Sequence, residues 1–217
     1  MGAEASRGDQ AASTNASELA RNIAEAGTPE KFNQAWNRVQ DHRKALPLDA
    51  DREAADDAIW DKMKTHIDSA LKKSDPDWRM QGIEAARAFF SLKKARADLV
   101  NMDFVQFLLL TTLPDKDDED SDDDDGKAQA KDDKDSRKER ENQGQRLAAR
   151  TMQEIADYPD FVKTLCRTSV LNFLSIVLNQ LDHEEETVTD TFVKISKDPS
   201  HLVLLVEDSV GDILESF

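Results

Sequence analysis

The sequence predicts an all-α protein whose helical parts are separated by a long acidic loop. Two observations carry this prediction. Apolar residues recur at helical spacing along most of the chain, and prolines preceded by short polar or acidic residues stand where helices would begin. The single run suited to a strand, Val203–Val206, has no second apolar run with which it could pair.

An acidic segment at residues 115–141 divides the chain. It contains 14 acidic and 7 basic residues and neither aromatic nor branched apolar residues. Such a segment cannot bury enough apolar surface to compensate for the entropy lost on ordering, so we expect a disordered loop. Its net charge of −7 is a large share of the −16 carried by the whole chain of 217 residues.

Three further segments follow from this division. Residues 1–16 are small and polar, and we expect them to form a disordered arm. A helical part at 17–114 precedes the acidic loop, and a second helical part at 142–217 is expected to pack on the first. The expected contact joins the apolar helices Met102–Leu113 and Phe161–Leu181, because the former has no later partner in its own part.

Helix starts and stops are evident in the first helical part. A short helix at 17–26 ends at Gly27, and Thr28-Pro29-Glu30 then supplies a cap, a first-turn proline and a first-turn acid. A third helix begins near Asp49 or Asp51. The apolar stripes of the second and third helices are Phe32, Trp36 and Val39, then Ala55, Ile59, Met63, Ile67 and Leu71.

A fourth helix starts at Ser74–Trp78 and carries an apolar face made of Ile83, Ala86, Phe89 and Phe90. We expect it to end in a charged turn region at Lys93–Asp98. The stretch 101–113 that follows is strongly apolar, so it should be the most buried element of the first part. Pro114 ends it.

The second helical part is organised around one apolar segment. A helix from Arg137 to Ala156 precedes it and presents Leu147, Met152 and Ile155. The central segment, opened by Pro159, is apolar on more than one side and breaks near Thr168. Two shorter helices follow, at 184–196 and after Pro199. The predicted core residues on either side of the acidic loop are Phe104, Leu108, Phe173 and Leu174.

The helix-opening prolines suggest a repeat. Pro29, Pro76, Pro159 and Pro199 are separated by 47, 83 and 40 residues, and the middle spacing is close to two units with a loop inserted. The stretch DPDWRMQGIEAAR from Asp75 resembles the opening of a HEAT-type helix. This resemblance to HEAT and armadillo repeats, whose period is about 40–47 residues, implies a right-handed stack of helices like an α-solenoid. An irregular helical bundle is the alternative, because proline is common at helix starts in any fold.

Cysteine content and the N-terminus bear on the compartment. Cys166 is the single cysteine, so no disulfide forms within the chain, and no run of about 20 apolar residues or secretory leader is present. We expect a cytoplasmic protein, with the nucleus as the alternative. Gly2, followed by a serine four residues on, fits the N-myristoylation template. A single acyl chain there would give only weak, reversible membrane contact.

The residue types that usually form catalytic, metal-binding or phosphate-binding sites are scattered along the sequence. No catalytic, metal or cofactor site is predicted: four histidines lie far apart, Cys166 has apolar neighbours, and glycines form no phosphate loop. The acidic run has a serine where a calcium loop begins with aspartate, and it lacks the closing glutamate. Ser121, followed by Asp122, Asp123, Asp124 and Asp125, is similar to sites of acidophilic kinases.

These features favour a non-enzymatic protein-interaction module or adaptor that binds another protein through a helical groove or an acidic surface. The pI near 4.6 predicts a partner with a basic face and disfavours direct binding of nucleic acid. One alternative is an acidic escort for a basic client, such as a histone or ribosomal protein, contacted by Asp122–Asp125. Another is a structural subunit of a cytoskeletal or ciliary assembly.

Overall fold

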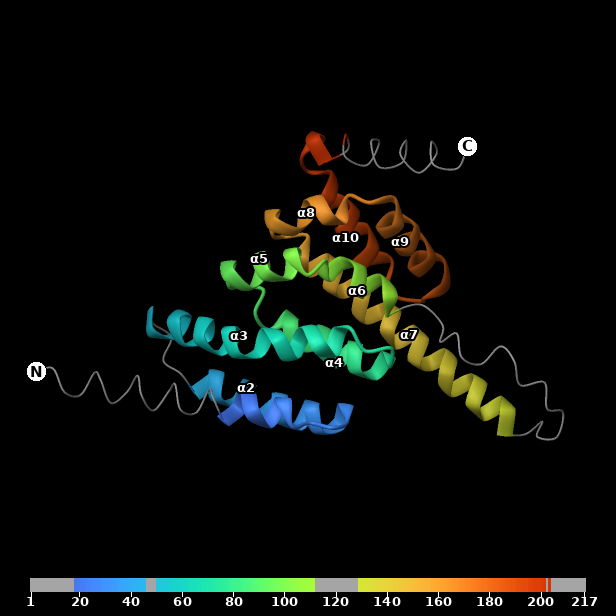
Figure 1. Ribbon diagram of the computed structural model, residues 1–217. Coiled ribbons are helices and arrows are strands. Elements are labelled where there is room, and N and C mark those ends of the chain that lie inside the picture. Colours follow the sequence, from blue (N-terminus) through green and yellow to red (C-terminus); the bar gives the residue numbers. More distant parts are fainter. Residues whose placement is uncertain (1–17, 46–49, 112–128, 202, 204–217) are drawn as a thin grey trace, which may run out of the picture. The chain divides into compact units, whose positions relative to one another are not determined.

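The computed structural model describes residues 18–45, 50–111, 129–201 and 203. Every regular element in this part of the chain is a helix, so the prediction of an all-α fold is confirmed (Figure 1). The chain forms two compact units, which we call unit 1 (Met1–Met102) and unit 2 (Asp103–Phe217). The boundary thus lies at Met102, before the acidic segment at which the sequence analysis divided the chain.

Unit 1 consists of a short helix at 18–24 followed by α2 (Pro29–Ala45), α3 (Ala50–Leu71), α4 (Pro76–Arg87) and α5 (Lys93–Asn101). Helix α4 packs on both α2 and α3, and α5 packs on α3 (Figure 1). The predicted apolar stripes fill the space between these helices. The buried stripe residues are Phe32, Trp36, Val39, Ile59, Met63, Ile67, Leu71, Ile83, Ala86, Phe89 and Phe90.

The first turn of α4 shows why proline opens helices in this chain. Pro76 lacks an N–H, and at this position an N–H would have no helical acceptor. The side chain of Asp75 accepts a hydrogen bond from the backbone N–H of Asp77 at 2.9 Å, which satisfies one of the donors left free at a helix N-terminus. Helices α2 and α8 (Pro159–Leu165) also begin at the predicted prolines.

A buried ion pair joins α2 to α3. Arg43 donates from Nε and Nη2 to the two carboxylate oxygens of Asp56, at 2.7 and 2.9 Å, and these side chains are only 9% and 7% exposed. Its third donor, Nη1, reaches the carbonyl oxygen of Ala88 just after α4, at 2.8 Å. The guanidinium carbon also lies 4.5 Å from the centre of the Phe89 ring. One side chain of α2 is therefore bonded both to α3 and to the end of α4.

The charged stretch Lys93–Asp98 is helical and belongs to α5, so the prediction of a turn region there was wrong. Only Ala95 and Leu99 are buried in this helix, which is too few for an apolar period to be visible. Three polar contacts hold it on α3 instead, one of them between Lys94 and Asp61. Trp60 Nε1 and Lys64 Nζ both donate to Asp98 Oδ2, at 2.8 and 3.2 Å.

Unit 2 contains α6 (Phe104–Leu110), α7 (Gln129–Ile155), α8, α9 (Thr168–Gln180) and α10 (Glu185–Ser196). The longest helix, α7, contacts each of the other four (Figure 1). Residues 129–141, expected within the disordered loop, are the first half of α7, which corrects that prediction. Ser136 and residues 138–140 are exposed, so no apolar pattern marks this half of the helix in the sequence.

Small residues dominate the packed face of α7. Met152 and Ile155 are buried as predicted, but Leu147 is half-buried, and Gly144, Ala148 and Ala149 face inward. A Cβ atom at Gly144 would lie 3.0 Å from the carbonyl oxygen of Thr111, directly after α6. Glycine therefore permits a close approach between the end of α6 and α7.

The helix before the acidic segment packs on the helices after it, as predicted. Helix α6 contacts α7 and α9, and the centre of the Phe104 ring lies 6.4 Å from that of Phe161. Phe104, Leu108, Phe173 and Leu174 are all buried, so the four predicted core residues are confirmed. The helix starts later than the predicted Met102, because Asp103 adopts a left-handed conformation with φ 55°.

The central apolar segment forms two helices. Helices α8 and α9 are bent by 84° relative to each other, and the break falls at Cys166 and Arg167, next to the predicted position. Arg167 Nη1 donates to Asp103 Oδ1 at 2.9 Å. The bend between α8 and α9 is thereby tied to the start of α6.

Replacing Arg43 by methionine is expected to lower the free energy of unfolding by about 3–5 kcal/mol, because Asp56 would keep a buried charge without its partner. The control is Arg21→Met, since Arg21 and Glu25 form an ion pair whose side chains are both 68% exposed. That variant should lose at most about 0.5 kcal/mol. Urea titration followed by helical circular dichroism measures both values. Equal losses would contradict a structural role for the buried pair.

Truncation of Phe104 to alanine is expected to cost about 3–5 kcal/mol, because it removes a buried ring and leaves a cavity beside Phe161. Val193→Ala is the matched control, since Val193 is exposed on α10 of the same unit. It should change stability by less than about 0.5 kcal/mol. Thermal and urea unfolding of the two variants test this. A nearly neutral Phe104→Ala would show that this face of α6 points to solvent.

Candidate functional site

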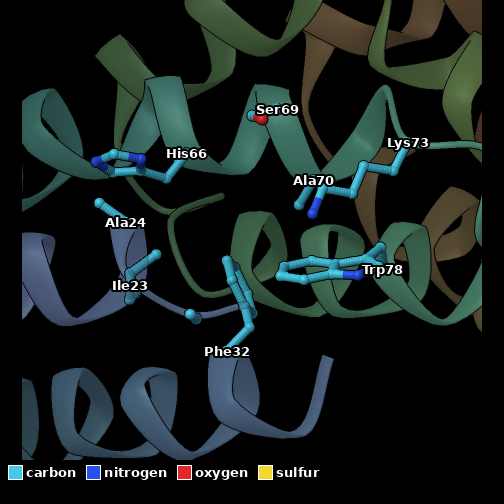
Figure 2. A pocket seen from close by; sticks show the side chains of 9 residues that line it. Ile23, Ala24, Phe32, His66, Ser69, Ala70, Lys73 and Trp78 are labelled. Carbon is cyan, nitrogen blue, oxygen red and sulfur yellow. The ribbon is translucent and has the colours of Figure 1, made fainter. Parts of the chain in front are cut away.

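Unit 1 contains a small pocket between the helix at 18–24 and α2, α3 and α4 (Figure 2). Its volume is about 70 Å³. That is roughly the space of two water molecules, whereas sites for small molecules span about 300–1,000 Å³. The pocket therefore suits part of a side chain better than a cofactor. It is lined by Ile23, Ala24, Ala26, Phe32, His66, Ser69, Ala70, Lys73 and Trp78.

An aromatic wall and two nitrogen-bearing side chains set the chemistry of this pocket. The Phe32 and Trp78 rings meet edge to face at 5.7 Å, and Lys73 Nζ lies 3.3 Å from the centre of the Trp78 ring, a cation–π contact. Figure 2 shows His66 at the other side of the pocket. This arrangement can hold a small apolar group beside an anion. It pairs no nucleophile with a base, since Ser69 and His66 are not hydrogen-bonded to each other in the structure as described.

The residues predicted to carry a modification or a partner contact lie outside the described residues. These are Gly2, Ser121, Asp122, Asp123, Asp124 and Asp125. Myristoylation, phosphorylation and contact of the aspartates with a basic partner therefore stay predictions. Within the ranges that the structure does describe, no three His, Cys, Asp or Glu side chains are grouped so that they could hold a metal ion.

The single cysteine and the histidines occupy separate places. Cys166 is buried directly after α8, and burial raises the pKa of its thiol, in agreement with the predicted buried cysteine. His66 is half-buried at the pocket. His183 is exposed with φ 71°, and His201 Nδ1 lies 2.9 Å from the carbonyl oxygen of Ile195. No two of these histidines share a site in the described structure.

A polar network joins α7 to α10 in unit 2. Lys194 Nζ donates to Asp157 Oδ2 at 2.8 Å and to the carbonyl oxygen of Gln153 at 3.1 Å, and it lies 3.1 Å from Asp190 Oδ2. Burial by itself would lower the pKa of Lys194, but the hydrogen bonds to Asp157 and Asp190 outweigh it and raise this pKa. Gln153 Nε2 donates to Asp190, which together with Lys194 lowers the pKa of that carboxyl. The charges of Lys194, Asp157 and Asp190 are therefore paired with one another within unit 2.

Three other carboxylates lie just after α9 or in the first turn of α10. Asp182, Glu185 and Glu186 are exposed, and none has an ion-pair or hydrogen-bond partner among the residues described. The neighbouring Glu184 contrasts with them, because its side chain is only 1% exposed and accepts a 2.6 Å hydrogen bond from Arg150 Nη2. One acidic run thus contains one structural carboxylate and three that face solvent. The sequence analysis did not distinguish the buried Glu184 from the three exposed carboxylates beside it.

Comparison of the chain with protein-family models, with curated proteins and with solved structures finds no match. The resemblance to HEAT and armadillo repeats accordingly stays a prediction. Of the helices that the structure describes, none is by itself long and apolar enough to cross a membrane. Helices α8 and α9 taken together would be long and apolar enough by length and composition. They are bent by 84° relative to each other, however, and both contribute buried residues to unit 2.

Cys166 should react slowly with thiol reagents in the folded protein. A raised pKa leaves less thiolate at a given pH, and burial blocks access to the sulfur. At pH 8 we expect labelling at least about tenfold slower than in the urea-unfolded chain. The rate of colour release from an aromatic disulfide reagent measures this. Equal rates in folded and unfolded protein would place Cys166 at the surface.

Proposed function

We propose that this protein is a non-enzymatic interaction module that binds another protein with a basic face through an acidic surface. The observation that carries this proposal is the group of Asp182, Glu185 and Glu186, three exposed carboxylates without partners in the described part of the chain. Other carboxylates of unit 2, such as Glu184 and Asp157, are bonded to Arg150 and Lys194.

Helix dipoles act on these carboxylates in opposite directions, adding to the negative potential at Asp182 and stabilising the charges of Glu185 and Glu186. The C-terminal end of α9 carries the negative end of the helix dipole, and it immediately precedes Asp182. Glu185 and Glu186 lie in the first turn of α10, where acids also stabilise the helix. Their side chains nevertheless remain exposed and available to a partner. Because they are solvent-exposed, their attraction for a cation must weaken as salt is added.

The proposal differs from the escort alternative in the segment that makes contact. An acidic escort for a basic client would use Asp122–Asp125, which lie outside the described residues. The interaction module proposed here uses a folded surface with a fixed geometry. The two functions therefore predict that different substitutions abolish binding.

Substitution of the three carboxylates tests the proposal. We expect the triple variant D182N/E185Q/E186Q to bind fluorescein-labelled polylysine about tenfold more weakly at low ionic strength, because each lost contact is worth about 0.5–1 kcal/mol. The control E18Q/E25Q/D41N removes three exposed carboxylates of unit 1 and should bind almost normally. Fluorescence anisotropy at about 0.01 and 0.15 M salt measures both affinities and their salt dependence.

Two outcomes would contradict this function. Equal weakening by the two triple variants would show that net charge, and not this group of carboxylates, drives binding. Binding that is lost only when Asp122–Asp125 are changed to asparagine would favour the escort function instead.

A further inference from the structure

The small pocket of unit 1 has an apolar floor that is open to solvent at its edge. Four buried side chains, which we call the pocket floor, are Ile23, Phe32, Ala70 and Trp78. Ala24, which also lines the pocket, is exposed. An apolar group that enters from solvent would therefore leave water and contact packed apolar and aromatic side chains, which is favourable in proportion to the area that it buries.

The polar side chains of the pocket all come from α3 or from the turn directly after it. His66 and Ser69 are three residues apart and lie on one face of α3, and Lys73 follows its end. Figure 2 shows Lys73 extending towards the ring of Trp78, with His66 at the other side of the pocket. Among the described residues that line the pocket, none is acidic. The charge at the pocket is therefore positive.

Lys73 differs from its neighbour Lys72 in how its charge is used. Lys72 Nζ donates to Asp68 Oδ2 at 2.7 Å. Lys73 has no carboxylate partner among the residues described, and its Nζ lies 3.3 Å from the centre of the Trp78 ring. An ammonium group has three N–H donors, so an anion can bind to Lys73 while the ring contact persists.

We propose that this pocket binds a segment of another protein in which a small branched apolar residue, such as valine, is followed directly by an acidic residue. The branched side chain contacts the pocket floor, and the acidic side chain pairs with Lys73. A volume of about 70 Å³ admits the tip of one side chain, whereas a cavity that holds benzene is about 150 Å³. This inference goes beyond the proposed function, because it concerns unit 1 and a partner segment of opposite charge.

Charge favours an acidic occupant over a basic one. Residues 18–102 contain 15 basic and 15 acidic residues, so this part of the chain is neutral although the whole chain carries −16. A second cation lies beside Lys73, because Arg79 Nε donates to the carbonyl oxygen of Lys73 at 2.7 Å. A basic segment would meet both cations and be repelled, whereas an acidic segment complements them.

Size favours a protein segment over a free metabolite. The pocket admits only a few atoms, and the binding free energy that a few atoms can supply is limited. A peptide chain continues beyond the pocket and adds contacts with the exposed side chains at its edge, such as Ser69. The pocket then supplies an anchor, and Lys73 supplies the selectivity for charge.

The experiment uses the full-length protein and a peptide of about eight residues, extended enough to reach beyond the pocket on both sides. It carries valine followed by glutamate in a background of glycine and serine. The indole N–H resonance of Trp78 in isotope-labelled protein reports binding. We expect about tenfold weaker binding when alanine replaces the valine, because two methyl groups are lost. Glutamine in place of the glutamate should weaken binding about three- to fivefold.

Two variants of the protein test the roles assigned to the pocket. K73Q should weaken binding of the glutamate peptide about three- to fivefold and leave the glutamine peptide unaffected, whereas K72Q, the matched control, should change either affinity less than about twofold. A24L places a larger side chain at an exposed position of the pocket. It should weaken the valine peptide about tenfold or more and leave the melting temperature nearly unchanged.

Several results would overturn the inference. No shift of the Trp78 resonance with the valine–glutamate peptide would show that the pocket does not bind such a segment. Equal weakening of the glutamate and glutamine peptides by K73Q would show that Lys73 does not pair with the acid. Equal binding of the valine and alanine peptides, or full binding by A24L, would show that the pocket is not the contact.

Two further variants identify other occupants and separate this inference from the proposed function. Val206 and Leu214 directly precede glutamates near the end of this chain. Tighter peptide binding by V206S/L214S would show that this segment competes for the pocket, which overturns the assignment to another protein. D182N/E185Q/E186Q should bind the peptide normally even if it no longer binds polylysine. Loss of peptide binding in that variant would place the contact on unit 2 and refute the pocket.

Discussion

The packing of unit 1 depends on one buried side chain, Arg43. Its guanidinium forms two hydrogen bonds with Asp56 on α3, one with the carbonyl oxygen of Ala88 after α4, and a cation–π contact with Phe89. The pair is nearly excluded from water, so each charge is tolerated only because the other neutralises it with bidentate geometry. This requirement fixes the end of α2 relative to α3 and α4, which apolar stripes alone would leave free to slide.

In unit 2 the helices are held in position by several separate contacts instead of one buried side chain. Gly144 lets α7 approach the end of α6, Arg167 ties the bend before α9 to Asp103, and Lys194 joins α10 to α7. The ion pairs of Arg167 and Lys194 are partly exposed, and each contributes little by itself. Arg150, Arg167 and Lys194 are thus each paired with a carboxylate of the same unit. Asp182, Glu185 and Glu186, near the connection between α9 and α10, have no such partner among the described residues.

The partial success of sequence reasoning follows from the range of the forces involved. Proline starts and the apolar stripes of α2, α3 and α4 were predicted correctly, because capping and helical periodicity act within a few residues. Helix α5 was missed, since it is held by contacts to another helix: Trp60 and Lys64 of α3 donate hydrogen bonds to Asp98 of α5. The pocket beside Trp78 was also missed. Its lining comes from four helices, and no local sequence pattern shows that these residues meet.

The sequence by itself determined that the chain is helical, where the helices opened by Pro29, Pro76 and Pro159 begin, and which side chains form the apolar stripes of α2, α3 and α4, because these depend on local backbone chemistry and apolar period. It also set the acidity on which the proposal of a basic partner rests. Tertiary structure alone decided which charges are used within the fold. Glu184 and Glu185 are neighbours of identical chemistry, yet one is buried against Arg150 and the other faces solvent. That difference depends on where α7 lies against α10, a contact between residues more than thirty positions apart.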